Sequence, residues 1–140
     1  MTNTTIYSES NINITDGVII YIKDSFNFKS ETIIAGMKCL LTVLDLGTRH
    51  IGILANYRPH VVNVTDFINS LGQYLQNTHL EETEIIVGDI NIDILTSSEE
   101  SNDYLNILYE FGFISTINKF IRIEKNSKTC LDHLFIKLPI

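Results

Sequence analysis

Residues 86–93 read IVGDINID, and this stretch decides the fold because an apolar run breaks at a glycine and then alternates with polar side chains. In an extended strand, successive side chains point to opposite faces. The alternation therefore predicts that Asp89, Asn91 and Asp93 share one face of a strand, while the isoleucines between them point to the other face. Two carboxylates and an amide on one face suit a metal ion or a water molecule.

The composition places this stretch within one globular domain. The chain has 140 residues, of which 44% are hydrophobic and 19% are charged, which is enough for a substantial core. Its formal net charge of -7 argues against a protein that holds nucleic acid by bulk electrostatics, because such domains carry an excess of Lys and Arg. Any phosphate contact is then expected to be local or mediated by a metal.

Cysteine usage and hydropathy indicate the setting of the protein. Cys39 and Cys130 lie far apart and lack the spacing of a zinc site or of a disulfide-rich secreted scaffold. We therefore expect a reduced intracellular setting, which includes the nucleus. Apolar stretches stay short of membrane-spanning length and the longest carry charges, so the sequence predicts a soluble protein without membrane contact.

The first half of the chain has the pattern of strands. Residues 1–15 are polar and are predicted to be a flexible segment, and order is expected to begin with a strand over residues 17–23. Residues 37–46 and 50–57 are apolar runs joined by Gly-Thr-Arg at 47–49, which is typical of an antiparallel hairpin.

Two segments have the period of an amphipathic helix. One begins after Asn63, with Thr65 as the predicted N-cap, and the other ends at Gly112, which suits a left-handed C-terminal cap. The remaining predicted strands are residues 84–88, 113–117 and 130–136. Strands therefore dominate, and the sequence predicts layers in which helices pack on a sheet.

The acidic stretch also matches part of an EF-hand calcium loop. The residues at positions 1, 3, 5, 9 and 12 of that loop would be Asp89, Asn91, Asp93, Ser97 and Glu100. Position 6 requires glycine but is Ile94, and the preceding segment is predicted to be a strand where an EF-hand has a helix. A solvated face of an edge strand is a further alternative for the same residues.

Residues 129–136, TCLDHLFI, place polar groups inside a second apolar strand. A carboxylate buried there is costly unless it is paired or bound to a metal, so Asp132 needs a partner if it is buried. His133 by itself is more typical of a hydrogen-bonded structural histidine than of a catalytic one.

Three short motifs now occur in a fixed order, at residues 57–59 (YRP), 88–91 (GDIN) and 130–135 (CLDHLF). Together they resemble the endonuclease/exonuclease/phosphatase superfamily, and especially the endonuclease domains that precede reverse transcriptase in non-LTR retrotransposons. Residues 16–23 resemble the glycine-led strand of those domains, and residues 104–113 resemble their helix and strand after the Gly-Asp-x-Asn motif. The resemblance implies an α+β fold, with a partial DNase I-like β-sandwich flanked by helices over residues 16–140.

The resemblance also implies metal-assisted hydrolysis of phosphodiester bonds in DNA, with Mg²⁺ as the cofactor. Asp89 would orient or deprotonate the attacking water, and Asn91 would hold that water or a phosphate oxygen. Asp132 would support the metal side or the catalytic histidine, which completes the candidate catalytic set. Tyr57 would bind the phosphate and Thr129 would add a polar contact, and no metal ligand is assigned.

Two family features have no counterpart in the sequence, namely a metal-binding Glu upstream and a Ser-Asp-His motif downstream. We therefore expect a domain that is truncated at both ends. Three functions remain open: a retroelement-derived endonuclease, a catalytically inactive remnant with a binding or interaction role, or, third, a calcium-binding loop protein. Exposed strand edges in a truncated sandwich favour self-association.

Overall fold

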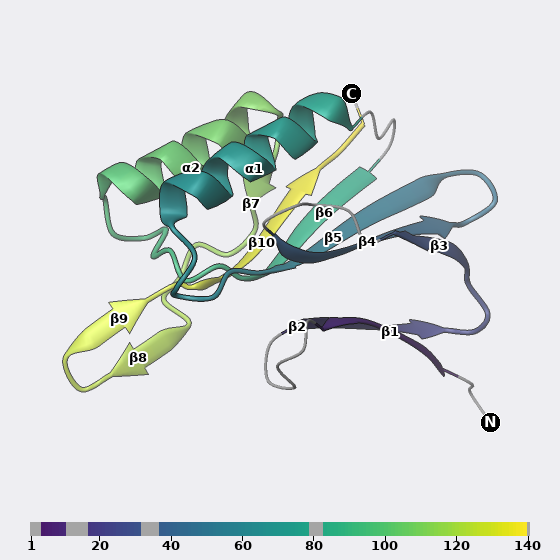
Figure 1. Ribbon diagram of the computed structural model, residues 1–140, viewed down its shortest axis with the longest axis horizontal. Coiled ribbons are helices and arrows are strands. Elements are labelled where there is room, and N and C mark those ends of the chain that lie inside the picture. Colours follow the sequence, from purple (N-terminus) through teal and green to yellow (C-terminus); the bar gives the residue numbers. More distant parts are fainter. Residues whose placement is uncertain (1–3, 11–16, 32–36, 79–82, 140) are drawn as a thin grey trace.

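The computed structural model describes residues 4–10, 17–31, 37–78 and 83–139. Its centre is a six-stranded sheet with the strand order β3-β4-β5-β6-β10-β7 (Figure 1). The strands are β3 (Asn27–Glu31), β4 (Lys38–Asp45), β5 (His50–Tyr57), β6 (Thr83–Asp89), β10 (Asp132–Lys137) and β7 (Ile114–Ser115). β5 and β6 run parallel, and the other neighbouring pairs run antiparallel.

Two helices cover one face of this sheet (Figure 1). The helix α1 (Val64–Asn77) connects the parallel strands β5 and β6, because parallel neighbours need a crossover that spans the sheet. The helix α2 (Glu99–Glu110) connects β6 to β7. Neither helix is long and apolar enough to cross a membrane.

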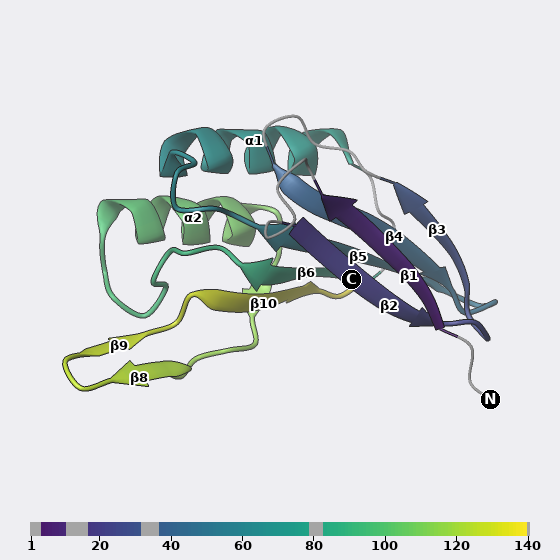
Figure 2. The same cartoon turned by 60° about the horizontal axis from the view of Figure 1, so that its bottom comes forward.

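A second, two-stranded sheet lies over the opposite face. Its strands β1 (Thr4–Ser10) and β2 (Gly17–Lys23) pair antiparallel and lie against β4 and β5 (Figure 2). A third pair, β8 (Arg122–Glu124) and β9 (Ser127–Thr129), forms a hairpin that projects beyond the main sheet (Figure 1). The arrangement confirms the predicted α+β fold, a partial β-sandwich flanked by helices.

One row of side chains shows why the helices cover this face. The register aligns four apolar side chains across β4, β5, β6 and β10, which we call the core row: Leu41, Leu54, Ile86 and Phe135. All four are buried and belong to one cluster with side chains of both helices. Tyr104 of α2 packs edge-on against Phe135, with ring centroids 5.9 Å apart. Burial of each such side chain contributes about 1.5–3 kcal/mol.

The predicted hairpin and C-terminal cap are confirmed. β4 and β5 pair antiparallel, and Gly47 in their turn has a φ of +82° while its N–H donates to the Asp45 carboxylate. Gly112 follows α2 with a φ of +84°, the left-handed conformation expected after a helix end.

Two predictions at the ends of elements are wrong. Asn63 caps α1 in place of Thr65, because the Asn63 side-chain carbonyl accepts the N–H of Asp66. Thr65 lies inside the first turn. Residues 4–10, predicted to be flexible, form β1, because their Thr, Ile and Tyr residues suit a strand and the full length pairs with β2. The predicted boundary near residue 16 lies outside the described residues and stays a prediction.

Candidate functional site

Three of the predicted site residues lie side by side at one end of the main sheet. The register pairs Tyr57 of β5 with Asp89 of β6, and Asp89 with Asp132 of β10. We call these three the site row. Each lies three positions from the core-row residue of its own strand, an odd offset that directs its side chain to the face opposite the helices. Asp89 is half-buried, and Asp132 is exposed and so does not need the buried partner that its apolar surroundings implied.

Gly88 controls the approach of β5 and β6 beside this row. Its φ is +153°, and a Cβ on it would lie 1.7 Å from the backbone oxygen of Asn56. Only glycine tolerates both this conformation and this contact. The glycine that precedes Asp89 in the sequence is therefore required by strand packing, which in turn aligns Asp89 with Tyr57.

The predicted strand face over residues 89–93 is wrong, because β6 ends at Asp89. Asn91 has a φ of +56°, a left-handed conformation that Asn adopts more readily than most residues. Ile90 and Ile92 remain buried, as the apolar half of the pattern predicted. The bend at Asn91 sends Asp93 to partners outside the site row.

Arg58 holds the bend in place. Its Nε donates to the Ile90 carbonyl at 2.7 Å, its Nη2 to the Asn91 carbonyl at 2.8 Å, and its Nη1 to the Val62 carbonyl. In return, the Asn91 side-chain Nδ2 donates to the Arg58 carbonyl at 2.8 Å, and the Arg58 N–H donates to the Asp89 carbonyl at 2.9 Å. Arg58 is thus a positioning residue for the loop that carries Asn91.

Burial lowers the pKa of Arg58, and the carboxylates of Glu100 and Asp89 oppose that shift. The guanidinium still keeps its charge, because an Arg side chain does not lose its proton in proteins. No role for Arg58 was predicted from the sequence. The available signal was a charged residue placed directly between an apolar strand and a proline.

Asp93 ties the loop to the segment that leads into β10. Its Oδ1 accepts the N–H of Cys130 at 2.9 Å and that of Leu95 at 3.3 Å. Burial by itself would raise the pKa of Asp93, but hydrogen bonds from Thr96, Cys130 and Leu95 outweigh it and hold that pKa below its usual value. Asp93 therefore has a structural role.

His133 faces the helices and is a hydrogen-bonded structural histidine, as predicted from the sequence. Its Nε2 lies 2.9 Å from the Ile92 carbonyl oxygen and 3.1 Å from the Cys130 carbonyl oxygen, so Nε2 carries the proton and donates. Its Nδ1 then accepts from the Tyr104 hydroxyl at 3.2 Å. Both ring nitrogens therefore form hydrogen bonds inside the core.

We expect the buried His133 to make the protein less stable at mildly acidic pH. Burial lowers the pKa of His133 from its ordinary 6.5, while the hydrogen bonds to Cys130 and Ile92 oppose part of that shift. The unfolded chain therefore binds more protons below pH 6.5, so the stabilisation is complete above that pH and is lost as the pH falls.

Urea unfolding at about pH 7.5 and about pH 5 measures this dependence. His133→Gln removes the titrating ring, so the free energy of unfolding of the variant should change less between the two pH values than that of the native chain. Equal changes in the two proteins would contradict the assignment.

Thr129 ends β9 and pairs with Arg122, and its backbone carbonyl accepts the N–H of Ile121 at 3.1 Å. Among the described residues, its side chain makes no hydrogen bond to the site row. The predicted substrate contact of Thr129 stays a prediction, as do the roles of Tyr57, Asp89, Asn91 and Asp132.

The site row fits one side of a metal centre. Asp89 Oδ1 is buried without a hydrogen-bond partner, which leaves a carboxylate oxygen for a water molecule or a cation. Mg²⁺ is usually bound through one or two carboxylates together with water and substrate phosphates. Over the described ranges, however, no group of three His, Cys, Asp or Glu side chains is arranged to hold a metal ion.

The EF-hand alternative does not agree with the structure. The residues before Asp89 form β6, whereas an EF-hand loop follows a helix. Asp93, which would be a calcium ligand, instead accepts two backbone N–H groups.

Comparisons with known proteins place the fold. No family model matches the sequence, and no curated protein is similar to it. The endonuclease domain of TRAS1, a telomere-specific non-LTR retrotransposon, has a similar structure, with a TM-score of 0.69 and 10% identity over 96% of this chain and 67% of that chain. An endonuclease/exonuclease/phosphatase family protein from Leptotrichia buccalis has a TM-score of 0.68 and 15% identity, over 96% of this chain and 60% of that chain. TDP2 of D. rerio, complexed with a single-strand DNA product, has a TM-score of 0.66 and 13% identity, over 97% of this chain and 62% of that chain.

At these identities the likeness shows the fold alone. The chain has the DNase I-like fold of endonuclease/exonuclease/phosphatase proteins, as its three motifs predicted. It spans between 60% and 67% of the length of the three matched chains.

Proposed function

We propose that this chain is a retroelement-derived endonuclease domain that hydrolyses phosphodiester bonds of DNA with Mg²⁺. The observation that carries the proposal is the site row, in which Tyr57, Asp89 and Asp132 are adjacent across three strands. The DNase I-like fold supports it, because solved structures with this fold include a retrotransposon endonuclease domain and a DNA-bound TDP2.

Asp89 has the central role in this proposal. Asp89 is half-buried at the end of β6, where its carboxylate would orient the attacking water and accept its proton. Asp132, exposed on the neighbouring strand, adds a carboxylate to the same side of the site. Mg²⁺, when bound by these oxygens, would stabilise the charge that develops on the phosphate.

Tyr57 and Asn91 would bind the phosphate. The Tyr57 hydroxyl can donate to a phosphate oxygen, and Lys38 on β4 extends the site row by one positive charge. Asn91 uses one amide hydrogen on the Arg58 carbonyl, which leaves its second amide hydrogen for the water or the phosphate. These contacts are local, as the net charge of -7 requires.

A catalytically inactive remnant is the second candidate. It is favoured by the small donor set, since the described residues bring two carboxylates to the site row and no third His, Cys, Asp or Glu side chain. Loss of one metal ligand or one acid/base group typically lowers the rate by orders of magnitude. The same fold would then serve binding without cleavage.

Nicking of supercoiled plasmid by the full chain, with Mg²⁺ or with EDTA, separates the two candidates. We expect Mg²⁺-dependent nicking that Asp89→Asn lowers by at least about 100-fold. Asp66→Asn is the matched control, because it makes the same chemical change on α1, across the sheet from the site row.

Two results would count against the endonuclease. Nicking that stays at background with a folded native chain would leave the remnant as the function. Nicking that Asp89→Asn does not reduce would exclude Asp89 from the chemistry.

A further inference from the structure

All charged side chains of the two helices are acidic, and most of them belong to α2. Within their bounds, α1 contains one carboxylate and α2 contains four, and neither helix contains Lys, Arg or His. The two helices together therefore contribute -5 to the net charge of -7. The five residues are Asp66, Glu99, Glu100, Asp103 and Glu110.

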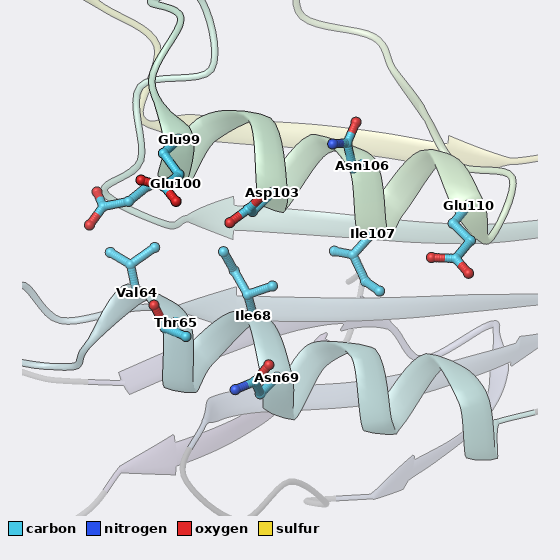
Figure 3. A pocket seen from close by; sticks show the side chains of 10 residues that line it. All are labelled: Val64, Thr65, Ile68, Asn69, Glu99, Glu100, Asp103, Asn106, Ile107 and Glu110. Carbon is cyan, nitrogen blue, oxygen red and sulfur yellow. The ribbon is translucent and has the colours of Figure 1, made fainter.

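A groove of about 520 Å³ runs between the two helices. Figure 3 shows Ile68 of α1 and Ile107 of α2 directed into the space between the helices, with Val64 at one end. Glu99, Asp103 and Glu110 follow one another along the α2 side of the groove. The groove therefore combines a half-buried apolar floor with an acidic rim, which suits a partner that is both cationic and apolar.

The same chain presents a surface of that chemistry. The β8–β9 hairpin with the residues before it (119–129) contains four cationic side chains and one acidic one, Glu124. The cationic residues are Lys119, Arg122, Lys125 and Lys128. Three large apolar side chains are exposed beside them: Phe120 at 42%, Ile121 at 45% and Ile123 at 68%. In both views the hairpin lies apart from the helices (Figures 1 and 2).

From this complementarity we infer that the β8–β9 hairpin of one copy docks in the α1/α2 groove of a second copy. Lys and Arg side chains of the hairpin meet the carboxylates of the rim, and the exposed isoleucines cover the apolar floor. Because two different surfaces meet, the contact is head-to-tail and leaves one groove and one hairpin free at the ends of each assembly. A contact made by a single hairpin, with exposed ion pairs at its rim, is weak and sensitive to salt.

Sedimentation velocity of the full chain over a range of concentrations tests the contact. We expect concentration-dependent association at about 50 mM NaCl that weakens at about 500 mM. Asp103→Lys/Glu110→Lys should abolish it from the groove side, and Lys125→Glu/Lys128→Glu from the hairpin side. Both pairs of positions are exposed, and the cation that Glu110→Lys places in the last turn of α2 interacts favourably with the helix dipole. The variants should therefore keep the native circular dichroism spectrum.

Mixing the two double variants gives the sharpest result. Each keeps the surface that the other has lost, so an equimolar mixture should associate under conditions in which neither variant associates alone. Asp66→Lys, on α1 but outside the groove, and Arg49→Glu, in the turn between β4 and β5, are the matched controls and should associate like the native chain.

Several results would overturn the inference. A native chain that stays monomeric at low salt would overturn it. If the hairpin variant also lost affinity for DNA, the hairpin would be assigned to nucleic-acid binding instead. Association that persists at high salt and in both double variants would assign the contact to the sheet edges β3 and β7. A mixture that remains monomeric would exclude pairing of these two surfaces.

Discussion

Gly88→Ala is expected to prevent stable folding, or to lower the free energy of unfolding by more than about 4 kcal/mol. The added Cβ would lie 1.7 Å from the Asn56 backbone oxygen, and backbone atoms in a paired strand cannot move aside cheaply. Relief would require β5 and β6 to separate at the point where Tyr57 and Asp89 are aligned. Urea unfolding followed by circular dichroism measures the loss.

Gly47→Ala is the matched control for this prediction. Gly47 also has a positive φ, of +82°, but a Cβ on it would have no neighbour within 4 Å. We expect that variant to lose only about 1–2 kcal/mol from backbone strain. If Gly88→Ala cost no more than Gly47→Ala, the close approach of β5 to β6 would be wrong.

Arg58→Met is expected to lower the free energy of unfolding by about 3–5 kcal/mol. The variant keeps an apolar side chain of similar length but leaves the carbonyls of Ile90, Asn91 and Val62 without their charged donor. Arg58 is 4% exposed, so water replaces those bonds poorly. The denaturation midpoint in urea reports the loss, with an unchanged slope if folding stays two-state.

Two comparisons make the Arg58 prediction specific. Arg49→Met removes an exposed arginine from the turn between β4 and β5 and should change stability by less than about 0.5 kcal/mol. Arg58→Lys keeps the charge but not the planar fork of the guanidinium, so its free energy of unfolding should lie between those of the native chain and Arg58→Met. A loss in Arg58→Met no larger than that in Arg49→Met would contradict the role of Arg58.

Local sequence patterns predicted most of the central sheet and both helices. The β4–β5 hairpin followed from two apolar runs and a glycine turn, and α2 ended where Gly112 allowed it to end. These features depend on side-chain period and turn chemistry, which neighbouring residues set. The strands β3, β8 and β9 were not predicted, because they are short and polar and are held by pairing.

The candidate site was predicted in its members but not in its shape. Alternation along residues 89–93 indicated a single polar face, yet Asn91 bends the chain and Asp93 binds backbone N–H groups of residues 95 and 130. The bend depends on Arg58, which lies more than thirty positions away in the sequence. No pattern within one strand can report such a contact.

The sequence by itself determined the apolar periods, the turns, the end of the second helix before Gly112 and the order of the DNase I-like motifs, because each is encoded within a few neighbouring residues. Only the tertiary structure decided that Tyr57, Asp89 and Asp132 form one row while His133 faces the core. The physical reason is strand register: backbone hydrogen bonds between β5, β6 and β10 join distant segments, and a shift of one residue would send each side chain to the other face.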